Sequence, residues 1–244
     1  MNRSIVVEVD PALRPLIWWR ERGERVLRDV EPAETIAHIV QSVGVPVTEA
    51  GDVLIDGLAV DRALLRATRV GDARSLLVPP RRRPQDSARG FLLDVHLRAL
   101  ARRMRLLGLD VEYGPDADDD FLAARSATEH RVLLTRDRGL LFRGLVFDGA
   151  LIRHDDVDEQ LDDVLDRFRP ELAPWTRCLR CGSRLRDAAA EVVAPLVEPG
   201  TRRTYRQFSR CTGCGQVYWR GAHGPRLEAI IDRAMTARQP DGPG

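Results

Sequence analysis

Short apolar runs alternate with helically spaced apolar positions through residues 89–169. The runs predict strands at residues 91–94, 110–113, 132–134 and 150–153. One helix is predicted between the first two strands, ending at Gly108, and another after the last strand. Their buried faces are marked by Leu97, Leu100, Ala101, Met104 and Leu107, and by Val157, Leu161, Val164, Leu165 and Phe168. A further helix is predicted up to about Glu129. Strands that alternate with helices favour a parallel α/β sheet.

Residues 1–78 show a different order of patterns. An alternating stretch at residues 4–9 predicts a strand, and Ile36, Ile39, Val40 and Val43 predict a helix over 33–43. Short strands around a turn at Gly57 follow, and the last strand is predicted at residues 75–78. This order resembles the ubiquitin-like β-grasp fold of bacterial sulfur-carrier proteins. Those carriers end in a free Gly-Gly, whereas here the chain continues into two prolines, which favours a docking or substrate-positioning module.

Two breaks in the pattern divide the chain. Residues 78–90, VPPRRRPQDSARG, have the composition of a linker, and a helical pattern stops at Pro170. We therefore expect a β-grasp domain at 1–80, an α/β domain at 89–169, a third domain at 170–225, and a C-terminal helix and tail at 226–244.

Composition narrows the class of protein. The chain is 43% hydrophobic and 31% charged, as in soluble globular proteins. No apolar run approaches a membrane span of about 18 residues, and the N-terminus lacks the layout of a signal peptide, so a cytoplasmic location is expected. Residues 170–244 carry 12 arginines against 7 acidic residues. This local excess of positive charge suits a polyanionic partner.

Acidic residues follow each of the four predicted core strands. They are Asp94, the run Asp116-Ala-Asp-Asp-Asp120, Asp137, and the pair Asp155 and Asp156. Each one alone fits a helix N-cap or a solvated surface. Together they converge on the carboxyl edge of a parallel sheet, where sites form. Crowded carboxylates repel one another unless a cation compensates, and oxygen ligands favour Mg²⁺ or Mn²⁺.

Such a site suits metal-assisted phosphodiester hydrolysis. In the stretch RVLLTRDR (131–138), Asp137 would bind the metal, while Arg136 and Arg138 would contact phosphate. The alternative for the two arginines is ion pairing with the acidic run.

The four cysteines form two CxxC motifs, Cys178–Cys181 and Cys211–Cys214, separated by 29 residues. Each motif is followed by a glycine, and four thiolates suit a tetrahedral structural zinc site. The spacer is long for a zinc ribbon, but an inserted hairpin would accommodate it. Two disulfides or a redox pair are disfavoured alternatives for a cytoplasmic chain with two such motifs.

Aromatic and basic residues alternate around the second CxxC motif. Tyr205, Phe208, Tyr218 and Trp219 lie among Arg203, Arg206, Arg210 and Arg220. Such a surface suits phosphate contacts and base stacking on single-stranded nucleic acid. About half of these aromatic side chains are instead expected to fill the small core of a zinc ribbon.

The stretch FLLDVHLRALARRMRLLGLDVEYGPDADDDFL, followed by RVLLTRDRGLL, resembles bacterial PIN-like ribonucleases related to the C-terminal domain of the Mut-seven exonuclease. Members with an added N-terminal ubiquitin-like domain match residues 1–78. The resemblance implies metal-binding catalytic carboxylates at Asp94, Asp137 and the 116–120 run, where we favour Asp116 and Asp119. It also extends to the tail YWRGAH, which would bring His223 near the substrate. PIN-like domains often pair, which leaves a homodimer open.

The leading hypothesis is a Mg²⁺- or Mn²⁺-dependent ribonuclease. It has an α/β PIN-like core with a parallel sheet, an N-terminal β-grasp (ubiquitin-like) domain and a C-terminal zinc ribbon. Substrate contacts are expected from Arg136, Arg138, Arg206, Arg210, Trp219 and His223. The alternatives are a nonenzymatic RNA-binding or ribosome-associated protein with a degenerate acidic site, and an adaptor whose N-terminal domain binds a protein partner. The sequence distinguishes neither the RNA nor endonuclease from exonuclease action.

Overall fold

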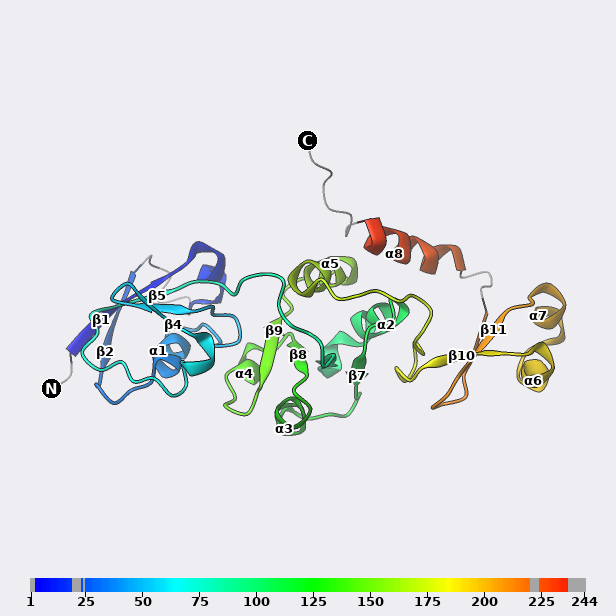
Figure 1. Cartoon of the computed structure of the whole chain (residues 1–244), viewed down its shortest axis with the longest axis horizontal. Coiled ribbons are helices and arrows are strands. Elements are labelled where there is room, and N and C mark those ends of the chain that lie inside the picture. The colour runs from blue at the N-terminus through cyan, green and yellow to red at the C-terminus, as the bar shows by residue number, and fades with distance from the viewer. Residues whose placement is uncertain (1–2, 19–22, 24, 220–223, 237–244) are drawn as a thin grey trace.

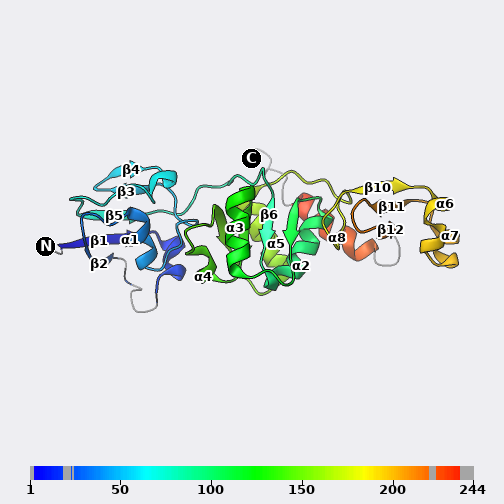
Figure 2. The same cartoon turned by 90° about the horizontal axis from the view of Figure 1, so that it is seen from below.

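A computed structural model describes residues 3–18, 23, 25–219 and 224–236 of the chain. Three units follow one another along its longest axis, each built on its own sheet (Figure 1). A five-stranded sheet lies at the N-terminal end, a four-stranded sheet in the middle and a three-stranded sheet at the far end. The turned view in Figure 2 shows the same succession of units. No helix in the described ranges is both long and apolar enough to span a membrane.

The N-terminal unit is a mixed sheet with the strand order β2-β1-β5-β3-β4, in which β1 and β5 are parallel. Helix α1 (Ile36–Ser42) packs on this sheet through buried Ile36, Ile39 and Val40. It starts later than the sequence pattern suggests because Thr35 is its N-cap, and Thr35 Oγ1 accepts a hydrogen bond from the His38 N–H at 3.2 Å. The ubiquitin-like prediction is confirmed. The strands are β1 (Arg3–Val9), β2 (Arg25–Val30), β3 (Val53–Ile55), β4 (Leu58–Val60) and β5 (Ser75–Val78).

The middle unit, called the core below, holds a fully parallel sheet in the order β7-β6-β8-β9. The chain runs from β6 to β7 on one side and then returns to β8 on the other. The order therefore reverses between β6 and β8, which is where open α/β sheets place their sites. The strands are β6 (Phe91–Leu93), β7 (Val111–Tyr113), β8 (Val132–Thr135) and β9 (Asp148–Leu151).

Helices cover both faces of the core sheet, so its central strands β6 and β8 are buried on both sides. Phe91 and Leu93 face a cluster formed with α2 (Arg98–Leu106) and α5 (Val157–Phe168). Leu92, which points to the opposite face, packs with α3 (Asp119–Glu129) and α4 (Arg138–Leu141). The alternation along β6 follows from the two-residue period of a strand.

Strand β9 lies two residues earlier than the sequence pattern predicts. It begins at Asp148, a buried acid, and Gly149, neither of which is typical of a strand interior. The Asp148 carboxylate is compensated by two arginines from the N-terminal side, Arg62 at 3.4 Å and Arg81. A tertiary ion pair thus permits a strand start that local pattern does not indicate.

The third unit, called the ribbon below, is an antiparallel sheet of β10 (Leu185–Ala188), β11 (Phe208–Cys211) and β12 (Val217–Trp219). Strands β10 and β11 pair as the inserted hairpin predicts, but the tip between them is helical. It contains α6 (Ala190–Val193), η5 (Ala194–Leu196) and α7 (Pro199–Thr204). Val193 from this tip is buried against Phe208 and Val217, which gives the ribbon its own small core.

Helix α8 (Gly224–Thr236) leaves the ribbon and returns to the core, where it lies alongside α2 and α5 (Figure 1). Ile231 and Ala234 are buried in the same cluster as the apolar faces of those helices. Arg233 pairs with Asp158 at 2.9 Å and with Asp162 at 3.3 Å. The ribbon is therefore connected to the core twice: by the segment that precedes β10 and by α8, which follows β12.

The N-terminal unit and the core share a polar interface. Arg167 of α5 pairs with Glu49 at 2.8 Å, and both side chains are at least nine-tenths buried. Gln85, from the predicted linker segment, accepts a hydrogen bond from Arg167 Nε at 2.9 Å. Breaking a buried ion pair by removing one partner costs about 3–5 kcal/mol. The segment between the two units is thus held in place by specific contacts.

Candidate active site and four-cysteine centre

Asp94 directly follows β6 and lies at the point where the strand order reverses. Its side chain is buried, with 4% of the residue exposed. Oδ1 accepts the His96 N–H at 2.8 Å, and Oδ2 accepts the Arg136 N–H at 2.9 Å and the Thr135 hydroxyl. Three hydrogen bonds fix the carboxylate, while its two oxygens offer about four acceptor positions. One position remains for a cation or a water.

Thr135 connects Asp94 to Asp137. Its hydroxyl donates to Asp94 Oδ2 and accepts the Asp137 N–H at 2.8 Å, and the residue is fully buried at the end of β8. Asp137 itself is exposed and caps α4, with Oδ1 accepting the Gly139 N–H at 2.7 Å. Sequence reasoning singled out both acids and assigned no role to the threonine between them. The only signal for it was its position at the strand end beside Asp137.

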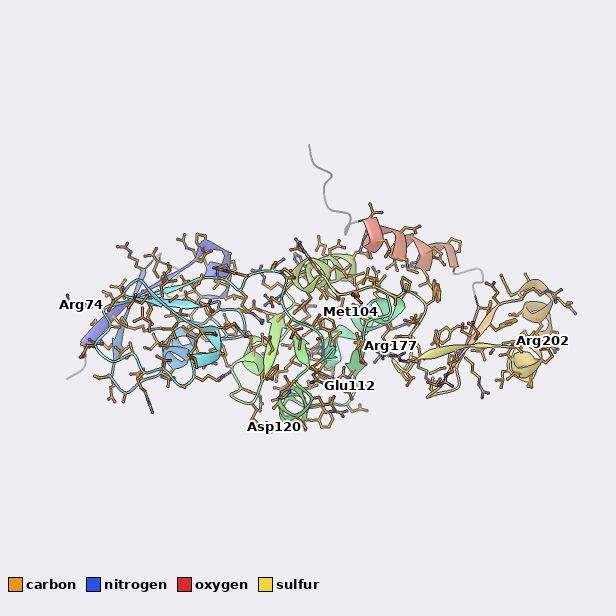
Figure 3. All side chains as sticks on the ribbon, viewed as in Figure 1. Arg74, Met104, Glu112, Asp120, Arg177 and Arg202 are labelled. Atoms are coloured by element: carbon orange, nitrogen blue, oxygen red, sulfur yellow. The ribbon has the colours of Figure 1, made fainter. Side chains whose placement is uncertain are left out.

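The acidic run spans the end of the loop after β7 and the first turn of α3, which begins at Asp119. Asp118 is the N-cap of α3 and accepts the Phe121 N–H at 2.8 Å, so the helix-capping interpretation is correct for this residue. Asp119 and Asp120 both pair with Arg143, Asp119 at 3.4 Å, and Figure 3 labels Asp120. Asp116 is exposed in the loop. The acidic run therefore contains carboxylates of three different kinds: Asp118 caps α3, Asp119 and Asp120 are ion-paired, and Asp116 is exposed in the loop.

The two arginines of the 131–138 stretch point to different partners. Arg136 is exposed and pairs with Asp155 after β9. Arg138 contacts the N-terminal unit: its guanidinium lies 3.9 Å from the centre of the Trp18 ring and donates to the Leu16 carbonyl at 2.5 Å. Arg136 is thus ion-paired, but its partner is Asp155 after β9 and not a member of the acidic run that the alternative predicted.

The carboxylates share one sheet edge without forming a closed ligand set. Over the described residues, one group of three or more acidic, histidine or cysteine side chains has all its ligand atoms within 4.8 Å of one another. That group is the four cysteines. Asp94, Asp116, Asp119 and Asp137 are brought to the same end of the sheet by β6, β7 and β8.

The four cysteines come together between the ribbon and the core. The Sγ atoms of Cys178 and Cys214 are 3.6 Å apart, and those of Cys181 and Cys211 are 3.4 Å apart. Four sulfurs at 2.3 Å from one zinc ion are separated by about 3.8 Å. All four are free thiols. The donor set and spacing are consistent with a structural zinc site.

Electrostatics at the cysteines agree with a site that needs a cation. Burial raises the pKa of the Cys214 thiol to about 12, and its hydrogen bonds to the other three thiols act in the same direction. For Cys181, burial also raises the pKa, but hydrogen bonds from Ser183 outweigh it and lower the pKa to about 6. Four thiols this close cannot all ionise without a compensating charge.

Arg105 of α2 supplies positive charge beside the cysteines. Its guanidinium is buried and donates to the Arg180 carbonyl at 2.9 Å and the Val111 carbonyl at 3.1 Å. Burial lowers the pKa of Arg105, while the thiols of Cys181 and Cys178 raise it. This residue links the core to the ribbon, and sequence reasoning did not identify it because its partners are distant in the chain.

The predicted substrate residues of the ribbon are exposed. Arg206 and Trp219 line one groove, together with Trp175 from the segment that enters the ribbon. Arg210 is also exposed, and its Nε donates to the Gly215 carbonyl at 3.4 Å. Phe208 is buried and Tyr205 packs against the ribbon core, as expected for about half of these aromatics. His223 lies outside the described residues.

The molecule thus combines a ubiquitin-like domain, a parallel α/β core with acids at its carboxyl edge, and a four-cysteine ribbon. Residues 89–231 match the model of the Mut7-C RNAse domain, and residues 2–86 match that of the Mut7-C ubiquitin domain. The first match covers more than half of the chain, and the chain belongs to the Mut7-C RNase domain family. No curated protein and no solved structure matches it.

Proposed function

We propose that this chain is a metal-dependent ribonuclease that hydrolyses RNA phosphodiester bonds at the carboxyl edge of the core sheet. The observation that carries the proposal is the buried, triply hydrogen-bonded Asp94 at the reversal of strand order, in a chain of an RNase family. Burying a carboxylate is costly unless it is paired or hydrogen-bonded, and three donors hold Asp94 at this position. Polar residues at this position of an α/β sheet are usually part of a site.

The residues that would hold Mg²⁺ or Mn²⁺ are Asp94, Asp137, and Asp116 or Asp119 from the acidic run. Their oxygens are the ligands these ions prefer. Asp94 keeps one acceptor position. Of the two carboxylate oxygens of Asp137, only Oδ1 accepts a hydrogen bond within the described part of the chain. A bound cation would supply an activated water and neutralise charge that develops on the phosphate.

The protein's own groups would orient these carboxylates and the substrate. Thr135 holds Asp94 and positions the backbone of Asp137 through a single hydroxyl. Arg136 would contact a phosphate in exchange for Asp155, whose side chain is 89% exposed. An exposed ion pair is worth only about 0–1 kcal/mol, so this exchange costs little. The phosphate role of Arg138 stays a prediction, which its contact with Trp18 makes testable.

The ribbon would contribute RNA affinity, and the four cysteines would bind zinc for folding. Arg206, Arg210 and Trp219 are exposed and suit phosphate contact and base stacking. Zinc held by four thiolates has no open coordination position, so it would take no part in hydrolysis.

The test compares the wild-type protein with Asp94→Asn and Asp137→Asn on labelled single-stranded and structured RNA. Each reaction is run with Mn²⁺, Mg²⁺ or EDTA. Asp232→Asn, an exposed acid on α8, is the matched control. The proposal expects metal-dependent cleavage that disappears in both site variants and persists in the control, with zinc content and circular dichroism unchanged. Equal cleavage by all variants would refute it.

A second candidate is a nonenzymatic RNA-binding protein with a degenerate acidic site. The observation that favours it is that Asp119 and Asp120 already pair with Arg143 and that the carboxylates form no closed ligand set over the described residues. This candidate expects no Mn²⁺ binding at the Asp94 edge. A Mn²⁺ titration of wild type against Asp94→Asn, followed by electron paramagnetic resonance, separates the two candidates.

A further inference from the structure

A cleft of about 590 Å³ separates the core from the ribbon. One wall is α2 with the end of β7, and the other is formed by the first CxxC motif and β12. Its lining contains four arginines and two tyrosines and no acidic residue: Arg98, Arg102, Arg105, Arg180, Tyr113 and Tyr218. The whole chain carries 37 acidic against 38 basic residues. Exclusion of acids from this one cleft therefore indicates a binding site for anions.

Three of the cleft arginines have no carboxylate partner within the part of the chain that the structure describes. Among the described residues, no ion pair or side-chain hydrogen bond involves the guanidinium of Arg98, Arg102 or Arg180, and all three are exposed. Their neighbour Arg103, on another face of α2, pairs with Asp158. Arg98 and Arg102 are one helical turn apart, and like charges at this spacing destabilise a helix. An anion bound between them would remove that repulsion.

Two tyrosines hold fixed positions in the same cleft. Both rings are half-buried, and both hydroxyls are engaged: Tyr113 donates to the Val95 carbonyl at 3.1 Å, and Tyr218 lies 3.1 Å from Cys178 Sγ. A ring held in this way loses little freedom when a base stacks on it. Basic side chains interleaved with aromatic rings are typical of single-stranded nucleic-acid binding.

The cleft lies beside the segment that follows Asp94, and it shares Tyr218 with the ribbon groove. The Tyr113 hydroxyl is hydrogen-bonded to the carbonyl of Val95, the residue that follows Asp94. Arg98, three residues after Val95, is the first residue of α2. Tyr218 also lines the groove that contains Arg206 and Trp219. Figure 3 shows Arg177 at the junction where the chain passes from the core into the ribbon.

We infer that single-stranded RNA runs through this cleft, with its backbone phosphates on Arg98, Arg102 and Arg180, on its way from the ribbon to Asp94. The inference rests on the proposed function for its choice of RNA as the polyanion. It adds three substrate-binding residues that lie in the core and the first CxxC motif, away from the basic stretch around the second motif. Arg105 has a different role, because its buried guanidinium is bonded to backbone carbonyls.

The test measures RNA binding by the full chain carrying Asp94→Asn, so that cleavage does not interfere. A fluorescently labelled single strand of about 12 nucleotides spans the length of one such binding surface. The cleft pair Arg98→Ala/Arg102→Ala is compared with Arg82→Ala/Arg89→Ala. The control pair removes the same charge from exposed arginines in the segment before β6, and neither residue lines the cleft. Alanine favours helix, so α2 is expected to stay folded.

The cleft pair should weaken binding about tenfold at moderate salt and reduce the slope of log K against log salt by about 1.4, since each lost phosphate contact removes about 0.7. Arg180→Ala should reduce the slope by about half as much. Arg98→Lys/Arg102→Lys should keep most of the slope, because the charge remains. The control pair should change binding far less than the cleft pair.

Equal effects of the cleft and control pairs would overturn the inference, because they would show only a nonspecific charge effect. Unchanged RNA binding by the cleft pair would overturn it as well. The cleft would then be a binding site for an anion other than RNA. Cleavage by the chain with intact Asp94, measured separately, tests the proposed function. RNA binding through the cleft without cleavage would sustain the inference and reject the nuclease, and the reverse result would do the opposite.

Discussion

The four-cysteine centre and the carboxylate edge are two sites of opposite construction. The cysteines form a closed set, with every ligand atom within 4.8 Å of the others, and no other residue is needed to complete it. The carboxylates share one end of the sheet, but each is held by a different partner: backbone N–H groups for Asp94 and Asp137, and Arg143 for Asp119. Soft thiolates suit zinc, and hard oxygens suit Mg²⁺ or Mn²⁺.

Under the proposed function, this difference would separate a site that supports folding from one that supports chemistry. A closed site binds its metal once, and that binding energy stabilises the ribbon. An open site with an unused acceptor position can take a cation together with a phosphate. We therefore expect loss of the cysteine metal to affect structure, and loss of the carboxylate metal to affect only activity.

The largest effect is expected from removing a cysteine ligand. Cys178→Ser should abolish zinc binding and unfold the ribbon, because structural zinc supplies about 10–16 kcal/mol in small metal domains. Zinc release on chelation and limited proteolysis between β10 and β11 measure this. Ser209→Ala, on the neighbouring strand, should keep both zinc and protease resistance. A folded, zinc-free Cys178→Ser protein would erase the contrast between the two sites.

Asp94→Asn comes next and should act mainly on the rate. We expect RNA cleavage to fall about a hundredfold or more, as when one preorganised charge contact is lost. An amide has only one acceptor oxygen, so the His96 or the Arg136 N–H loses its partner, at a cost of about 1–3 kcal/mol in stability. Cleavage rates and thermal unfolding measured together separate the two effects. A large loss of stability with no loss of rate would make Asp94 a purely structural residue.

Thr135→Val tests whether the carboxylate edge depends on its positioning hydroxyl. Valine keeps the shape and removes both hydrogen bonds, to Asp94 and from Asp137. We expect about 1–3 kcal/mol of lost stability and a slower cleavage step, with unchanged RNA affinity. Thr135→Ser, which keeps the hydroxyl, should retain most of the activity. If the two variants behave alike, the hydroxyl does not position the acids.

The smallest effect concerns Arg138. Its guanidinium lies over Trp18 and bonds to Leu16, so Arg138→Gln should lower the stability of the contact between the N-terminal unit and the core by about 1 kcal/mol. RNA affinity should stay near the wild-type value. A clear loss of affinity with unchanged unfolding would instead assign this arginine to the phosphate, as its place beside Asp137 in the sequence suggests.

The local sequence pattern was sufficient to predict the elements whose residues are buried at regular intervals. Strands β6 and β8 are apolar on both faces and stood out as short hydrophobic runs, and two CxxC motifs identified the cysteine centre whatever lay between them. Asp94 and Asp137 were found because acids directly follow those strands. In each case the relevant neighbours lie within a few residues of one another, which is the range over which sequence patterns carry structural information.

The features that pattern did not predict depend on distant partners. Strand β9 starts on Asp148 because arginines from another unit neutralise it, and the four-residue α4 is too short to show a period. Arg105 is one of many arginines until the ribbon folds beside it. The cleft itself exists only after α2 and the CxxC motif meet, so its three exposed arginines cannot be recognised as one group from the sequence alone.

The return of α8 to the core sets an order for assembly during synthesis. Ile231 and Ala234 cover apolar surface of α2 and α5, helices that leave the ribosome well before them. Until those last residues emerge, the core has a hydrophobic face open to solvent while the ribbon is already outside and able to collect its metal. A ribosome that stops early would therefore release a chain with both motifs intact and its central domain unsealed.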